Sequence, residues 1–292
     1  MCQYKVVLIN TFVESNHMRR LWFGCLVLGL SAFFLPLSAQ VHGKQAEDWP
    51  GFKRYEQANA EISQRPDVVL MGDSITDNWY NEDPDFFTSN NFVGRGIAGQ
   101  TASQMLCRFR QDVIALNPKI VAIMAGTNDI CQQMAGMAYY PDENIVGNIV
   151  SMCELAKVAG IKVLLCSITP CSSYMPVPHL DAGARIVEIN SRLKAYADAN
   201  KGIEWVDYFT PLANEKNGFD KDQSYDGVHP VVTVYHEMEK ILVNKLSGML
   251  RPRRSYYVIP MEKARELKAV KDVEWEQRMK EFRERFKKQE NE

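Results

Sequence analysis

Three residues that lie far apart in the sequence are of the types that a serine nucleophile and its base require. Ser74 lies in GDSIT, directly after the apolar run 67–71. A serine on such a turn exposes its hydroxyl near a helix N-terminus, where backbone N–H groups point outward. Asp226 and His229, in DGVHP, are three residues apart, so the carboxylate can reach Nδ1 of the imidazole and leave Nε2 free to accept a proton from Ser74. Each motif alone is also a common turn, but together they predict nucleophilic catalysis.

Two further residues could stabilise an oxyanion. Gly99, in GIAGQT, precedes a predicted helix and can offer an unobstructed backbone N–H, and Asn128, in AGTND, follows an apolar run and can offer its side-chain amide. With the backbone N–H of Ser74, these groups make three donors. Glycine and asparagine also favour ordinary turns, so the prediction depends on the set.

The elements that must position these residues alternate between strand and helix. Such alternation predicts a parallel sheet covered by helices on both faces, with ligand chemistry at the carboxyl ends of the strands. Short apolar runs predict strands, and 3.6-residue periodicity predicts helices. The predicted strands are 67–71, 92–93, 119–125, 161–168 and 203–206, and the predicted helices are 101–116, 142–159, 181–199 and 231–250.

These four blocks in this order resemble the SGNH (GDSL) hydrolase family, whose letters stand for Ser, Gly, Asn and His. The matching residues are Ser74, Gly99, Asn128 and His229, and the family's acid falls on Asp226. The resemblance covers about residues 65–250. It implies a flavodoxin-like three-layer α/β/α sandwich, no metal or organic cofactor, and ester hydrolysis through an acyl-enzyme.

A dinucleotide-binding fingerprint, Gly94-x-Gly96-x-x-Gly99, is also present letter for letter. It follows the second predicted strand and not the first. About twenty residues later stands Lys119, where an acidic ribose ligand is required. We therefore expect no nucleotide cofactor.

The first 39 residues are typical of a secretory signal peptide. Arg19 and Arg20 precede the uncharged apolar run 21–37, and small residues follow up to Ala39. Met18 is a second candidate for the start of translation, and an uncleaved anchor helix is the alternative. Cys25 is in a poor context for lipidation. The sequence thus predicts an exported protein, periplasmic or extracellular, without stable membrane insertion after cleavage.

Composition excludes several classes of partner and protein. The 292 residues are 46% hydrophobic and 24% charged, with 34 Lys+Arg against 36 Asp+Glu, a net charge of −2. This balance argues against disorder and against a nucleic-acid binder. Five cysteines remain after residue 39, an odd number that cannot all pair internally. We expect most of them to be buried as small hydrophobic residues, with a Cys166–Cys171 bridge as the alternative.

Residues 40–250 are expected to form the hydrolase domain, and residues 251–292 a linker and a charged helical tail. Residues 261–292 hold ten Lys+Arg and nine Asp+Glu. Four apolar residues in this tail are spaced 4, 3, 4 on one helical stripe: Trp275, Met279, Phe282 and Phe286. We expect this helix to dock on its own domain or to mediate a homo-oligomer.

The substrate is the least determined property. Asp73, Tyr174 and Met175 are expected to line the pocket, the last two on the proline-rich loop 169–179, while His179 and His236 have no identified partner. The leading hypothesis is removal of acetyl or other short acyl groups from a carbohydrate or other glycan. A lysophospholipase or thioesterase with a longer acyl pocket is the second, and a non-catalytic binding module of the same shape is the third.

Overall fold

The structure, a computed structural model, describes residues 48–174, 177, 180–250 and 255–289, with side chains up to residue 281. The signal-like segment, Met175 and His179 lie outside the described residues, as do the side chains of Phe282 and Phe286. Within the described part of the chain, no helix combines the length and the apolar character needed to cross a bilayer.

Five parallel strands form the central sheet, as the sequence predicts, and their order in the sheet is β2-β1-β3-β4-β5. In register, Val68 of β1 lies opposite Phe92 of β2 on one side and Ile120 of β3 on the other. β1 and β3 are buried along their whole length, as expected of strands covered on both faces. The strands are β1 Val68–Gly72, β2 Phe92–Gly96, β3 Ile120–Ile123, β4 Lys162–Cys166 and β5 Ile203–Val206.

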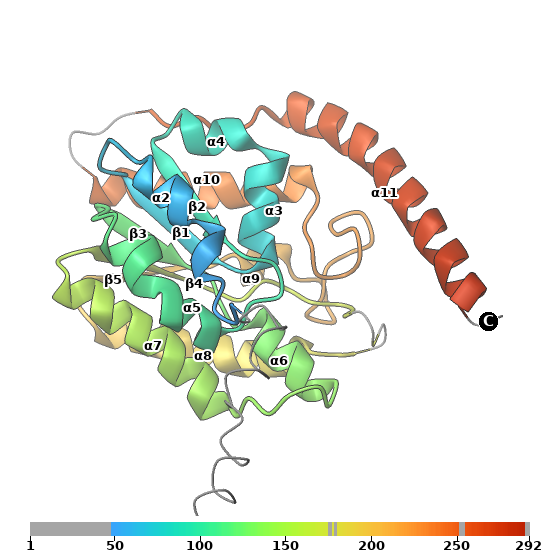
Figure 1. Ribbon diagram of the computed structural model, residues 1–292, viewed down its shortest axis with the longest axis horizontal. Coiled ribbons are helices and arrows are strands. Elements are labelled where there is room, and N and C mark those ends of the chain that lie inside the picture. Colours follow the sequence, from blue (N-terminus) through green and yellow to red (C-terminus); the bar gives the residue numbers. More distant parts are fainter. Residues whose placement is uncertain (1–47, 175–176, 178–179, 251–254, 290–292) are drawn as a thin grey trace, which may run out of the picture. The chain divides into compact units, whose positions relative to one another are not determined.

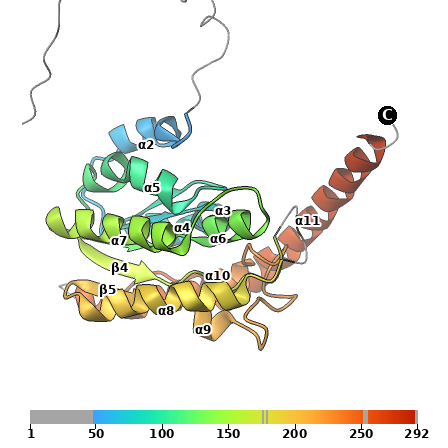
Figure 2. The same cartoon turned by 90° about the horizontal axis from the view of Figure 1, so that it is seen from below.

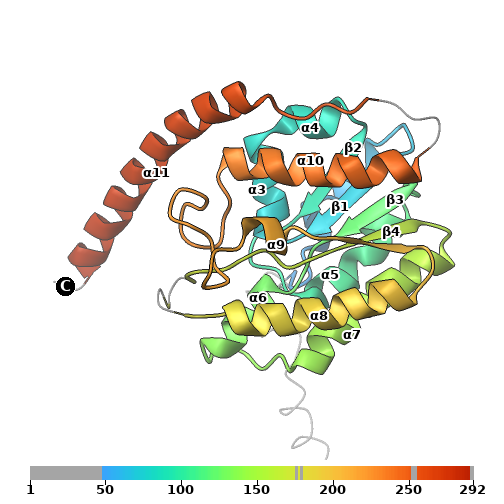
Figure 3. The ribbon, with the colours of Figure 1, turned by 180° about the vertical axis from the view of Figure 1, so that it is seen from behind.

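Helices cover both faces of this sheet, giving the predicted three-layer α/β/α architecture. α5 and α7 cover one face (Figure 1), and α3 and α10 cover the other (Figure 3). α8 runs alongside β5 and contacts α7 (Figure 2). The helices of the sandwich are α3 Ser74–Glu82, α4 Pro84–Thr88, α5 Ala102–Phe109, α6 Thr127–Met134, α7 Asp142–Val158, α8 Gly183–Ala199, α9 Phe209–Leu212 and α10 Val232–Met249.

Several helical segments differ from the sequence prediction, which does not include the short helices α4, α6 and α9. The helix predicted over 101–116 changes after Phe109 into a π-helical turn, Arg110–Ile114. Before β1, the chain forms a short 3₁₀ turn, Phe52–Arg54, and the helix α2, Glu56–Ala60, which lack buried residues and so gave no apolar periodicity.

An aromatic cluster fixes α3 against α10. The Trp79 ring stacks on Phe86 at 5.5 Å and on Tyr235 of α10 at 5.4 Å between ring centroids. The Tyr235 hydroxyl donates to the backbone carbonyl of Ile75 at 2.7 Å. These buried contacts hold the first turn of α3, which begins at Ser74.

The tail helix α11, Met261–Gln289, is joined to the body by a buried lead-in. Ile259 is fully buried against Val232, its N–H donates to Glu239 at 2.8 Å, and its carbonyl accepts from Nδ1 of His236 at 2.5 Å. Glu239 also accepts from Nε1 of Trp79 at 3.1 Å. His236 therefore has a partner, which the sequence did not indicate, and one carboxylate links α3, α10 and the start of the tail.

All five described cysteines are free thiols. Cys171 lies beside Cys131, with 3.8 Å between the two sulfur atoms, and not in a bridge to Cys166. The proposed Cys166–Cys171 pairing is therefore wrong for this structure: Cys166 belongs to buried β4, whereas Cys171 packs against α6.

Candidate active site

The predicted site residues converge at the carboxyl edge of the sheet. Ser74 follows β1 and Asn128 follows β3, and these two strands are neighbours although a second strand separates them in the sequence. Where β2 and β3 leave β1 in opposite directions, the sheet has its topological switch point, the usual position of a ligand site in this class of fold. Asp226 and His229 reach the same edge from the long connection between α9 and α10.

Ser74, His229 and Asp226 form a continuous chain of hydrogen bonds. Nε2 of His229 lies 2.8 Å from Oγ of Ser74, and Nδ1 lies 2.7 Å from Oδ2 of Asp226. The other carboxylate oxygen of Asp226 accepts from the backbone N–H groups of Val228 and His229 at 3.0 and 2.9 Å. This fixes the carboxylate in the plane from which it can hold the imidazole proton on Nδ1.

The pKa values of His229 and Asp226 are shifted in the directions expected of a hydrogen-bonded imidazole and carboxylate. Burial acts to lower the pKa of His229, but the hydrogen bond and negative charge of Asp226 outweigh it, so the pKa lies above its usual 6.5. Burial acts to raise the pKa of Asp226, and the bonds from His229 outweigh it, so that pKa lies below 3.8. Asp226 is therefore ionised at neutral pH and stabilises the imidazolium form of His229.

A close approach of two loops holds the turn between Asp226 and His229. Gly227 has φ +90°, and a Cβ there would lie 2.5 Å from Cβ of Ser173. Its carbonyl accepts from the N–H of Ser172 at 2.8 Å, and its own N–H donates to Ser224 at 2.8 Å. Only glycine fits this position, so the turn is locked onto the loop that also carries Tyr174.

Three donors suited to an oxyanion follow the carboxyl ends of β1, β2 and β3. Ser74 is the first residue of α3, where a backbone N–H has no intrahelical acceptor. Gly99 has φ +77°, and a Cβ there would meet no heavy atom within 4 Å. Asn128 is buried; its amide donates one hydrogen to the Gln100 carbonyl at 3.0 Å, and its oxygen accepts from Tyr174 at 3.4 Å. The second amide hydrogen remains for another acceptor.

Asp129 positions this donor group, a role the sequence did not suggest. Its carboxylate accepts from the N–H of Ala102 at 2.9 and 3.2 Å. It thereby ties the first turn of α6, which contains Asn128, to the start of α5, which follows the Gly99 loop. Burial raises the pKa of Asp129 to about 6. An acid directly after a candidate oxyanion donor is the signal that could have identified it.

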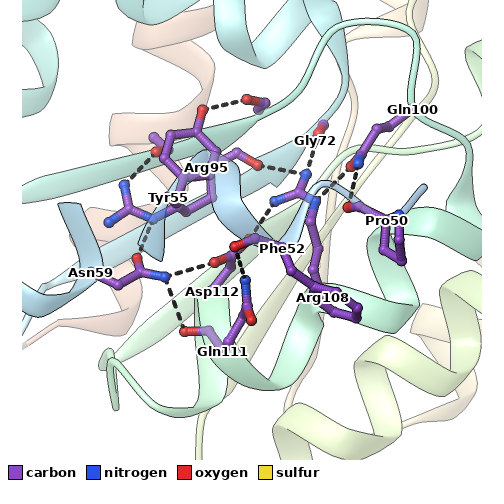
Figure 4. A network of polar contacts seen from close by, with 12 residues as sticks. Pro50, Phe52, Tyr55, Asn59, Gly72, Arg95, Gln100, Arg108, Gln111 and Asp112 are labelled. Atoms are coloured by element: carbon purple, nitrogen blue, oxygen red, sulfur yellow. Dashed lines mark hydrogen bonds and ion pairs between the residues drawn. The ribbon is translucent and has the colours of Figure 1, made fainter. Parts of the chain in front are cut away.

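Arg108 of α5 braces the strand ends beneath the site (Figure 4). Its fully buried guanidinium donates to the carbonyls of Gly72 and Arg95 at 3.1 and 3.0 Å, to the Gln100 side chain at 2.6 Å, and to Asp112 at 2.9 Å. It therefore connects the end of β1, the end of β2 and the loop whose carbonyl holds Asn128. An arginine on an otherwise apolar helical face, with an acid four residues later, was the available signal.

Asp73 and Tyr174, the two described residues that are expected to line the pocket, differ in their outcome. Asp73 is only 1% exposed, and its carboxylate accepts from the N–H of Ile75 at 2.9 Å, so it caps α3 and does not line a pocket. Burial raises its pKa to about 6. Tyr174 does reach the site through Asn128. Across the described residues, no group of three or more His, Cys, Asp or Glu is arranged to hold a metal ion.

The chain is similar to known proteins in both sequence and fold. Residues 70–236 match the model of the GDSL-like Lipase/Acylhydrolase family. The fold is similar to that of a GDSL-like lipase from Bacteroides thetaiotaomicron, at 40% identity and a TM-score of 0.66, and to that of a candidate acylhydrolase from Bacteroides fragilis, at 43% and 0.66. Each match covers 70% of this chain and 100% of the other chain.

A curated relative is the uncharacterized lipoprotein YqeF of Bacillus subtilis, 32% identical over 118 residues. That match covers 36% of this chain, and this chain spans about half (49%) of that protein's length. The family match, by contrast, contains the Ser74, Gly99, Asn128 and His229 blocks together. The chain belongs to the GDSL-like lipase/acylhydrolase family.

Proposed function

We propose that this protein is a serine esterase that hydrolyses carboxylic esters through an acyl-enzyme. One observation carries the proposal: the unbroken hydrogen-bonded chain from Ser74 Oγ to His229 Nε2 and from His229 Nδ1 to Asp226 Oδ2, at 2.8 and 2.7 Å. This is the arrangement that activates a serine hydroxyl, because the imidazole can take the hydroxyl proton while the carboxylate stabilises the resulting charge.

In the proposed mechanism, Ser74 Oγ attacks the ester carbonyl and its proton passes to Nε2 of His229. The N–H groups of Ser74 and Gly99 and the free amide hydrogen of Asn128 stabilise the tetrahedral oxyanion. As the intermediate collapses, His229 gives the proton to the leaving alcohol. A water then attacks the acyl-enzyme, again losing a proton to His229, and the acid is released with Ser74 restored.

For the substrate, we propose an acetyl or other short acyl ester of a carbohydrate, met outside the cytoplasm. Export is supported by the signal-like segment 18–39 and by the name of the Bacillus subtilis relative, a lipoprotein. The alternative within enzymes is a lysophospholipase or thioesterase with a longer acyl pocket. A binding module does not require a complete Ser, His and Asp chain, which disfavours that third possibility.

The experiment is a series of p-nitrophenyl esters from acetate to palmitate, alongside acetylated xylan with acetate release measured. We expect kcat/KM to be highest for acetate and to fall with chain length. A maximum at long chains would favour the lipase-like alternative. Absence of turnover on every ester, with the protein folded, would refute the esterase proposal.

A further inference from the structure

The tail helix α11 presents one continuous face to the body of the protein. Along it, partly or fully buried residues recur at helical spacing: Ala264, Leu267, Lys268, Lys271, Asp272, Trp275 and Met279. The chain between α9 and α10, which carries Asp226 and His229, lies between α11 and the sheet (Figures 1 and 3). The tail therefore passes directly over the catalytic histidine loop.

Two contacts fix α11 at this place. Nζ of Lys271 lies 3.1 Å from Oε2 of Glu82 on α3, and both side chains are largely withdrawn from solvent. The indole of Trp275 lies 5.5 Å from the ring of Tyr225, at an interplanar angle of 34°. Tyr225 is the residue before Asp226, and its backbone N–H donates to the carbonyl of His229 at 3.0 Å.

A cavity of about 300 Å³ lies between the tail and the proposed triad, at the lower end of the size range of ligand sites. His229 and Asp226 form one side of it, and α11 forms another. The α3 side continues the face on which Ser74 lies, because Asn78 and Glu82 follow it at four and eight residues. The full lining is Asn78, Glu82, Tyr225, Asp226, His229, Pro230, Lys271, Trp275 and Arg278.

The position of this cavity beside His229 indicates which part of an ester would occupy it. The leaving alcohol must receive its proton from Nε2 of His229, so it lies on the imidazole side of the tetrahedral centre. The lining contains His229 but not Ser74 or the proposed oxyanion donors Gly99 and Asn128. The cavity therefore borders the imidazole, on the side of the alcohol portion, and not the proposed site of the carbonyl oxygen.

The lining combines aromatic faces with neutralised charge. Trp275 and Tyr225 supply apolar ring surface, while Asn78 and the charged side chains supply hydrogen-bond donors and acceptors. Lys271 is paired with Glu82, and Asp226 is paired with His229, so Arg278 is the remaining cation of the lining, and it lies 3.7 Å from Glu274. Ring surface beside donors and acceptors of balanced charge suits a neutral sugar better than an acyl chain or a strongly charged group.

We propose that α11 forms one wall of the subsite for the alcohol portion of the ester, with Trp275 as the surface on which a neutral sugar ring packs. The proposal rests on the proposed esterase function and specifies its substrate class as a carbohydrate ester. The tail then determines specificity for the alcohol without contributing to the bond-making groups.

The test compares Trp275→Ala, Trp275→Phe and Val273→Ala on methyl acetate, whose alcohol is too small to reach Trp275, and on an acetylated xylo-oligosaccharide, with acetate release measured for both. Val273 is the matched control, because its side chain is 65% exposed on the same helix. For Trp275→Ala we expect KM for the oligosaccharide to rise about tenfold, equivalent to about 1.4 kcal/mol of binding. Turnover of methyl acetate should stay within twofold, Trp275→Phe should restore most of the loss, and Val273→Ala should change the kinetics of neither substrate.

An equal loss on both esters would refute the proposal, because Trp275 would then act only by holding Tyr225 and the histidine loop. No loss on the oligosaccharide would also refute it. A binding measurement separates this inference from the esterase proposal. In a Ser74→Ala background, calorimetry should show about tenfold weaker oligosaccharide binding when Trp275→Ala is added. Absence of ester turnover in the wild type would refute the function, whereas equal binding by these two variants would refute the subsite.

Discussion

Asp226→Asn is expected to lower kcat/KM for ester hydrolysis by about 10³–10⁴-fold, or roughly 4–5.5 kcal/mol, without unfolding the protein. The asparagine oxygen can keep the bonds from the N–H groups of Val228 and His229, which Oδ1 of Asp226 accepts at 3.0 and 2.9 Å. Its amide nitrogen would then face Nδ1 of His229, 2.7 Å away in the native pair. Because that nitrogen donates, the neutral imidazole would carry its proton on Nε2 and could no longer accept one from Ser74.

The pH dependence gives a second readout of the same variant. The wild-type base must be neutral, so kcat/KM should rise with pH through a midpoint above 6.5, because Asp226 raises the pKa of His229 despite burial. In Asp226→Asn the raising effect of the Asp226 carboxylate on the pKa of His229 is gone while burial still lowers that pKa, so the midpoint of the residual activity should move to lower pH.

The assay is p-nitrophenyl acetate hydrolysis between pH 5 and 9, with circular dichroism to confirm folding. Asp222→Asn is the matched control, since Asp222 is exposed in the same connection and has no partner role in the triad. Wild-type rates in folded Asp226→Asn, or an unchanged midpoint, would refute the assignment of Asp226 and of His229 as its base.

Four further predictions follow from the same structure. Ser74→Ala should lower the rate of ester hydrolysis by roughly 10³–10⁶-fold while the protein stays folded. A serine-reactive organophosphate should label Ser74 alone, and full activity in the variant would exclude Ser74 as the nucleophile. Asn128→Ala should lower kcat by about 10²–10³ with a smaller change in KM, whereas an effect confined to KM would contradict an oxyanion role. Burial raises the pKa of Glu239 from 4.5 to about 8, with the Asp83 carboxyl adding to it, so folding takes up a proton between these values and the free energy of unfolding should fall as pH rises across that range. Glu239→Gln should flatten this slope in urea unfolding at pH 5 and pH 8, and an unchanged slope would show that the proton is bound elsewhere. Truncation after Pro260 should leave a folded core that still hydrolyses p-nitrophenyl acetate. Loss of that activity in a folded truncated protein would show that the tail helps to form the active site and that the domain does not end before it.

The sequence predicted the strands, the layer architecture and the meeting of Ser74, Asp226 and His229. It could do so because each of the three has a local signature: an apolar run before Ser74, and the three-residue spacing of Asp226 and His229. Parallel strands place their carboxyl ends at one edge, so local positions along the chain translate directly into proximity.

The residues that the sequence missed or misassigned act through distant partners. Arg108 contacts carbonyls 13 and 36 residues away, and Glu239 contacts Trp79 across 160 residues. The only local sign of such long-range contacts in the sequence is a charged residue on an otherwise apolar helical face. Asp73 was misassigned for a related reason: its neighbour Ser74 faces the site, but capping turns the Asp73 carboxylate back onto the N–H of Ile75.

The sequence separation of 155 between Ser74 and His229 has a consequence for biosynthesis. Bringing the ends of a chain segment of this length together costs about 4–5 kcal/mol of chain entropy, which the sheet and its helices must offset before the serine meets its base. At a synthesis rate of about 5–20 residues per second, the ribosome adds His229 roughly 8–30 s after Ser74. A nascent chain therefore lacks the contact between Ser74 and His229 for most of its synthesis, and the proposed hydrolytic activity would report on completed folding of the whole sandwich.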